Sequence, residues 1–217
     1  MTLGNALKGV NVVFAHDTEL ALGSAAALVN TARDDIGVEV ELLPDQAALD
    51  AFLETWQWTG ARSNDEAELQ AVRDLRPRLA EFWTADEDRA VVVVNQLLRE
   101  FGALPQLLKH GQWGYHLHAT RLEAPLVDRM AVEAGMALID VIRMGELSRL
   151  RLCAGENCER VVVDLSKNRS RRFCEAGCGN RANVAAYRAR KRLEADRSDK
   201  TGLAADSAQR SSASGER

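Results

Sequence analysis

The sequence has no apolar run near the roughly 18 residues that a membrane-spanning helix requires. Its longest stretch of consecutive β-branched residues, 91–94, has four. The first residues also lack the basic region, hydrophobic core and small-residue cleavage site of a secretory signal. These absences argue against membrane and exported proteins, and we expect a cytoplasmic protein without a membrane partner.

Catalytic motifs are missing as well. The sequence has no serine in a nucleophile elbow, no glycine-rich phosphate loop and no pair of acids that stands out. Because nothing positive points to catalysis, we expect that the protein is not an enzyme. The 217 residues, 46% hydrophobic and 28% charged, are typical of one large globular domain or of one domain with a small appendage.

Charge is segregated along the chain. Residues 1–150 carry 13 Lys or Arg and 23 Asp or Glu, for a net charge of −10. Residues 151–192 carry 11 and 4, for a net charge of +7, and residues 193–217 are close to neutral. Because phosphate responds to the local field, the overall charge of −4 does not exclude a nucleic-acid partner.

The first 150 residues have mainly helical periodicity. Apolar side chains recur at three- and four-residue spacing. The expected helices are 17–31, 47–58, 65–82, 86–101 and 125–147. Two shorter apolar runs at 104–108 and 113–118 flank Gly111 and predict a β-hairpin, and residues 10–14 form a short strand or an apolar lead-in. The expected class is α+β, mainly α, with a helical N-terminal domain that contains a small hairpin.

All four cysteines fall inside the basic segment. They form two closely spaced pairs, Cys153 with Cys158 and Cys174 with Cys178. In a chain without an export signal, such pairs indicate metal ligands more readily than disulfides. Four thiolates from two short loops suit one tetrahedral, structural Zn²⁺. The alternatives are four free buried thiols or a redox disulfide within either pair.

The residues around the cysteines predict a treble-clef-like zinc finger. Residues 160–163 and 169–173 are expected to pair as strands, and residues 182–193 to form a helix. About forty residues bury too little apolar surface to fold alone, so the metal would supply much of the stability. One face of the helix is small and apolar, and we expect it to pack against the hairpin; it consists of Ala182, Ala186, Ala189 and Leu193.

Basic side chains dominate this finger. The guanidinium group suits phosphate and the guanine edge, and a helix fits the major groove of DNA. The alternative is a solvated basic face. Asn180 could instead cap the helix, and Arg181 could pair with Asp164. The candidate nucleic-acid-binding residues are Arg169, Arg171, Arg172, Asn180, Arg181, Arg188, Lys191 and Arg192.

Two histidines suggest a second site. His116 and His118 are two residues apart, so on a strand both side chains would point to the same face. Near Trp113 and Tyr115, histidine is more often a hydrogen-bonded structural residue. The other interpretation is a ligand pocket in the N-terminal domain.

The string Cys178-Gly179-Asn180-Arg181, with the upstream cysteines, resembles the CGNR zinc finger family. Residues 20–31 and 113–118 are similar to landmarks of the ABATE domain, which usually precedes that finger. The resemblance implies a bacterial, stress-induced transcription regulator with zinc on the four cysteines and DNA as the partner of the finger.

These observations give a three-part organisation. Residues 1–148 form an ABATE-like, mostly helical domain, residues 149–193 the zinc finger, and residues 194–217 a disordered tail. We expect a zinc-dependent DNA-binding regulator whose acidic domain senses a small-molecule effector or mediates assembly, for example as a homodimer. The alternatives are a ligand-binding protein or enzyme that uses His116 and His118, with the finger as a structural support, and a zinc module that binds RNA or protein.

Overall fold

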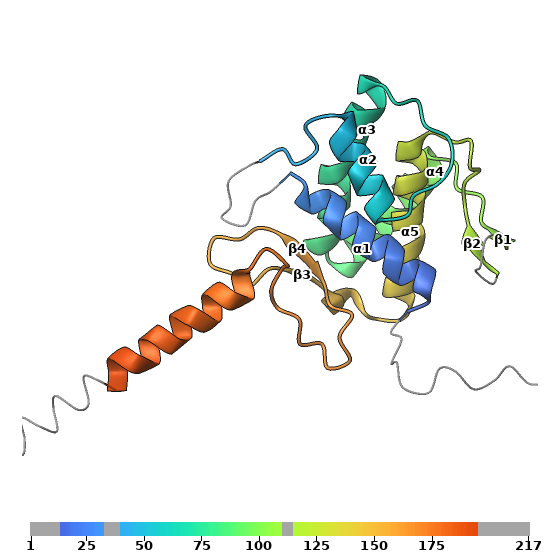
Figure 1. Cartoon of the computed structure of the whole chain (residues 1–217). Helices are drawn as coiled ribbons and strands as arrows, with labels where there is room; N and C mark the ends of the chain where they lie inside the picture. Colours follow the sequence, from blue (N-terminus) through green and yellow to red (C-terminus); the bar gives the residue numbers. More distant parts are fainter. Residues whose placement is uncertain (1–13, 33–39, 110–114, 195–217) are drawn as a thin grey trace, which may run out of the picture.

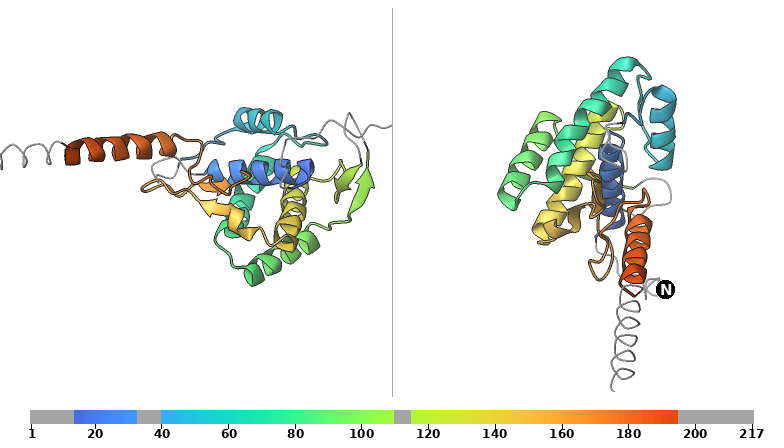
Figure 2. Two further views of the ribbon diagram at one scale, coloured as in Figure 1. Left: turned by 90° about the horizontal axis from the view of Figure 1, so that it is seen from below. Right: turned by 90° about the vertical axis from the view of Figure 1, so that its left-hand side faces the viewer.

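The computed structural model describes residues 14–32, 40–109 and 115–194, and Figure 1 shows how they are arranged. Five helices form a bundle, a hairpin stands beside it, and a small cysteine-rich region with a long final helix follows (Figures 1 and 2). The expected tail lies outside the described residues, as does the strand at 10–14 apart from Phe14. The bundle consists of α1 (His16–Asn30), α2 (Gln46–Thr55), α3 (Glu66–Ala80), α4 (Glu87–Glu100) and α5 (Leu126–Arg143).

Aspartates fix where three of these helices begin. The carboxylates of Asp45, Asp65 and Asp86 each accept a hydrogen bond from the backbone N–H three residues later. Such a cap satisfies one of the four donors that a helix leaves unpaired at its start. All five expected helices are present, and α3 continues through Pro77 into a short 3₁₀ turn, η1 (Glu81–Trp83).

Helix α5 lies at the centre of the bundle, in contact with α1, α3 and α4. Leu69, Leu97 and Leu138, one from each of α3, α4 and α5, are completely buried. The expected hairpin is also present: β1 (Gln106–Leu108) pairs antiparallel with β2 (His116–His118), with Leu107 opposite Leu117. No helix within the described residues is long and apolar enough to cross a membrane.

The strand pairing expected in the finger is wrong. Strand β4 (Val161–Val163) pairs with β3 (Leu150–Leu152), which precedes the first cysteine, and residues 169–173 form no strand. The reason lies in the side chain of Asp164. Its carboxylate accepts hydrogen bonds from the backbone N–H groups of Ser166 and Arg171, which turns the chain into a loop instead of a second strand.

Strand β4 separates two apolar clusters. Val161 and Val163 are buried in the core of the helical bundle, whereas Val162 packs among the cysteines. The side-chain amide of Asn30, the last residue of α1, donates to the Val161 carbonyl at 3.0 Å and accepts from its N–H at 2.8 Å. The indole of Trp83 donates to the Val162 carbonyl at 3.0 Å. The bundle and the cysteine-rich region therefore share one wall.

Residues 178–194 form a helix that projects away from the bundle (Figures 1 and 2). The expectation that its small apolar face packs against the hairpin is wrong. Ala186, Ala189 and Leu193 are exposed, and Ala182 is only partly buried. Alanine side chains offer little apolar area to bury, so they cannot hold the helix against the protein.

Candidate metal centre and ligand cavity

The four cysteines converge on one point. Their sulfur atoms all lie within 4.8 Å of one another, and all four residues are buried. The Sγ of Cys174 lies 3.8 Å from that of Cys158 and 3.5 Å from that of Cys178. These separations are far longer than a disulfide bond of about 2.05 Å, so the thiols are free.

The arrangement fits a tetrahedral metal ion. Zinc–sulfur bonds of about 2.3 Å give a tetrahedron with edges of about 3.8 Å, which matches the sulfur separations. Cys153 and Cys158 come from the loop between β3 and β4, whereas Cys174 and Cys178 flank the turn that enters the final helix. The donor set and its spacing therefore make this cluster a candidate metal site.

The backbone prepares one sulfur for this role. Burial alone would raise the pKa of the Cys153 thiol, but N–H groups of Cys174 and Gly155 donate to its sulfur and the pKa is lowered. Burial raises the pKa of Cys158 to about 12, so a bound cation is needed to hold it as a thiolate at neutral pH. Gly155 is required for space, because a Cβ there would lie 2.8 Å from the Cys178 sulfur.

Arg181 lies against this centre. Its guanidinium donates to the Cys178 sulfur at 2.9 Å and to the Ala176 carbonyl at 3.1 Å. The expected alternative partner, Asp164, pairs instead with Arg151 at 3.4 Å. Asn180 is exposed in the first turn of the helix. Nucleic-acid contact by Asn180 and Arg181 remains a prediction.

Asp164 organises the arginine loop that precedes Cys174. It is completely buried, and burial opposes its ionisation. Hydrogen bonds from Ser166 and the charge of Arg151 outweigh burial and lower the pKa of the carboxyl. The loop then exposes Arg169, Arg171 and Arg172 at least in part. Arg169 pairs with Glu146 at 2.7 Å, Arg171 pairs with Glu175 at 2.9 Å, and Arg172 lies over the ring of Phe173.

The final helix carries the other basic residues. Arg188, Arg190 and Arg192 are exposed, and no ion pair is described for them within residues 115–194 or the other described ranges. Lys191 pairs with Glu194 at 3.3 Å. Arg190 was not among the sequence candidates; it lies on the opposite side of the helix from the stripe of Arg181, Arg188 and Arg192. Residues 183–194 are all exposed, so that side is accessible too.

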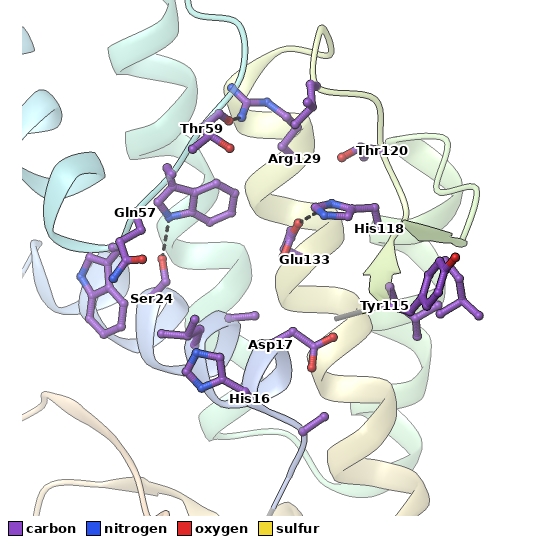
Figure 3. Close-up of a pocket in the computed structure, with 18 residues that line it drawn as sticks. His16, Asp17, Ser24, Gln57, Thr59, Tyr115, His118, Thr120, Arg129 and Glu133 are labelled. Carbon is purple, nitrogen blue, oxygen red and sulfur yellow. Dashed lines mark hydrogen bonds and ion pairs between the residues drawn. The ribbon is translucent and has the colours of Figure 1, made fainter. Parts of the chain in front are cut away.

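A separate cavity of about 520 Å³ lies in the helical bundle (Figure 3). Its walls come from the first half of α1, the segment after α2, the hairpin and α5. His118 lines it, with its Nδ1 3.7 Å from a carboxylate oxygen of Glu133 on α5. His116 pairs with Leu108 across the hairpin. The structure does not describe the side chain of His116.

Close backbone approaches shape this cavity. The guanidinium of Arg129 donates to the carbonyls of Thr59, Ala61 and Ala124. Gly60 permits this approach, because its φ is +103° and a Cβ would lie 2.7 Å from Arg129 Nη1.

The aromatic wall of the cavity has its own requirements. The ring of Trp56 lies against Gly23, where a Cβ would meet it at 2.8 Å, and the Trp58 indole donates to the Ser24 hydroxyl at 2.9 Å. Gly23, which interrupts the apolar pattern of α1, therefore has a packing reason.

Two family models match the chain. The ABATE model, described as "putative stress-induced transcription regulator", matches residues 23–145. The CGNR zinc finger model matches residues 149–191. A search of curated proteins finds no match. The first match begins within α1 and covers the rest of the bundle, including the cavity walls other than the first turns of α1. The second covers the metal site and most of the projecting helix.

Proposed function

The chain belongs to the ABATE family and carries a CGNR zinc finger after that region, and from this premise we propose that it is a zinc-dependent, DNA-binding transcription regulator. It acts by binding, not by catalysis, on DNA in the bacterial cytoplasm. The observation that carries the proposal is the helix at 178–194, which is basic, exposed and separate from the bundle (Figure 1).

The dimensions of this helix suit B-DNA. A helix with side chains is about 10–12 Å wide, and the major groove is about 12 Å wide. Its residues include five Lys or Arg and one Glu. Arg190 and the stripe of Arg188 and Arg192 lie on opposite sides, so both phosphate backbones that flank a groove are within reach of a cation. The major groove of A-form RNA is too narrow for a helix, which favours DNA over duplex RNA.

The zinc ion has a structural role in this proposal. Cys153, Cys158, Cys174 and Cys178 would hold one Zn²⁺, which supplies stability and a fixed geometry to a region that is short of apolar core. The ion joins the loop between β3 and β4 to the turn that starts the helix. The bundle, through β4, then fixes the direction in which the helix points.

Specificity requires more than one finger helix. One helix in a groove contacts few base pairs, so the proposal includes a homodimer or a second contact from the loop of Arg169, Arg171 and Arg172. The cavity in the bundle is the proposed place for a small-molecule effector, because it is of a size that binds ligands and lies in the part of the chain that the finger does not occupy.

The direct test is a fluorescence-anisotropy titration of the zinc-loaded full chain. Labelled duplex DNA from the upstream region of its own gene is used at several salt concentrations, with duplex RNA of the same sequence as competitor. The test variant replaces Arg188, Arg190 and Arg192 by Ala. The matched control replaces three exposed arginines of the bundle, Arg99, Arg121 and Arg143, and so changes the net charge equally.

The proposal makes a quantitative forecast. Loss of three phosphate contacts lowers the slope of log affinity against log salt by up to about 2.7, since each contact contributes about 0.9. The control variant should keep the slope of the original chain. Equal effects of the two triple variants would refute the helix as the DNA-binding surface, and stronger competition by RNA would refute the preference for DNA.

A further inference from the structure

The bundle cavity has the composition of a small-molecule site. At about 520 Å³ it lies within the range of ligand pockets, about 300–1,000 Å³. Its apolar walls include the aromatic side chains of Trp56, Trp58 and Tyr115, and the cross-strand pair Leu107 and Leu117. Trp58 is held in place by its hydrogen bond to Ser24, and Tyr115 is largely exposed at the hairpin.

The charged groups that line the cavity are unequal in what they can offer a ligand. The guanidinium of Arg129 donates to three backbone carbonyls and holds the segment after α2 onto α5. The carboxylates of Asp17 on α1 and Glu133 on α5 belong to the lining from two sides (Figure 3). His118 lies beside Glu133, and His16 adjoins Asp17. Negative charge and aromatic faces are thus combined around one cavity.

We propose that this cavity binds a small organic amine with an aromatic or other apolar body. The faces of indole and phenol rings attract a cation, and a carboxylate beside them supplies a charge-assisted hydrogen bond. A carboxylic acid of the same shape would place its negative charge against Asp17 and Glu133. The one permanent cation of the lining, Arg129, donates to three backbone carbonyls, so fewer of its N–H groups remain to bind such an acid.

Helix α1 connects this cavity to the finger. His16, Asp17 and Ser24 line the cavity, and Asn30 at the other end of the same helix holds the outer edge of β4. A role for the amine as effector rests on the proposed function, whereas binding of the amine is a property of the bundle alone. The experiment therefore measures the two separately.

Isothermal titration calorimetry on the zinc-loaded full chain, without DNA, tests the site. Three probes share one aromatic body and differ in charge: 2-(2-naphthyl)ethylamine, 2-(2-naphthyl)ethanol and 2-naphthylacetic acid. The test variants are Glu133→Gln and Asp17→Asn, which keep size and remove charge. The control is Glu87→Gln, an equal substitution at an exposed position in the first turn of α4. Thermal unfolding of each variant confirms that it is folded.

The amine should bind most tightly, the alcohol about tenfold or more weakly, and the acid most weakly, because a charge-assisted hydrogen bond contributes about this factor. Glu133→Gln should weaken binding of the amine by a similar factor and leave the affinity for the alcohol unchanged. Equal affinity for the three probes, no binding of any, or an unchanged amine affinity in both test variants would overturn the proposal. Adding the amine to the anisotropy assay then tests separately whether the cavity binds an amine and whether the protein binds DNA. A protein that binds the amine but not DNA would reject the proposed regulator function and leave the amine site in place.

Discussion

Replacing Asn30 by Ala removes the side chain that joins the bundle to the finger. The amide makes two hydrogen bonds to Val161, at 2.8 and 3.0 Å, on the edge of β4 that faces away from β3. Val161 is 4% exposed, so water does not readily replace the lost partner. The substitution therefore leaves the buried N–H and the buried carbonyl of Val161 without their hydrogen-bond partner.

The expected loss follows from these two bonds. Each contributes about 1 kcal/mol net, and a buried polar group left unpaired costs about 1–3 kcal/mol. Alanine favours the helix over asparagine by about 0.5 kcal/mol, which offsets a small part. We expect the free energy of unfolding to fall by about 2–3 kcal/mol, which moves the urea midpoint by about 1–1.5 M.

Urea unfolding of the zinc-loaded chain, followed by far-UV circular dichroism, measures this loss. The matched control is Asn95→Ala at an exposed position of α4, which should leave the midpoint almost unchanged. A second observable is release of zinc to a chromogenic chelator, which should coincide with unfolding of the helices. Two results would refute the claim that β4 couples the bundle to the cysteine-rich region. One is a urea midpoint of Asn30→Ala equal to that of Asn95→Ala, and the other is release of zinc well before the helices unfold.

Three further outcomes are expected. Removal of the metal by a chelator should lower the melting temperature of the bundle as well as of the finger, because β4 packs in both, and calorimetry should show one transition that shifts. Gly155→Ala should weaken zinc affinity, measured by chelator competition, because the added Cβ meets the Cys178 sulfur, while Gly102→Ala, whose Cβ would meet nothing within 4 Å, leaves it unchanged. Glu146→Gln should destabilise the chain at pH 7, because Arg149 and Arg169 outweigh the effect of burial and lower the pKa of this carboxyl. That difference should begin to shrink as the pH falls below about 4.3, the unfolded value, and vanish as the pH passes the lower folded pKa; a constant difference at all pH values contradicts the assignment.

Local signals in the sequence were sufficient for the helices and the metal site. Apolar periodicity predicted α2 to α4, and it acts within a few residues of the chain. The cysteine pairs predicted the cluster for the same reason, because short loops bring their ends together. The hairpin of β1 and β2 was equally local.

Features that depend on distant partners were not predictable. The partner of β4 is β3, whereas residues 169–173 belong to the loop that Asp164 holds, and no local pattern distinguishes the two pairings. Gly23 looked like a helix interruption until Trp56 was found against it. The cavity combines four separate segments, and nothing in the sequence brings these together; His118 was the candidate named for it. The domain boundary at 148 stays a prediction.

The projecting helix has a geometric consequence. Seventeen residues at about 1.5 Å each extend about 25 Å from Cys178, and within the described residues only the first turn touches the rest of the protein. The helix thus acts as a lever arm, and a rotation of about 8° at its base displaces its tip by about 3.4 Å, which is one base-pair step of DNA. On the proposed function, a small change at the metal site, which lies at the base of this helix, would shift the position of the helix tip along the duplex. Exchange of zinc for a larger thiophilic ion such as Cd²⁺ would then change which sequence is preferred, even where overall affinity is kept.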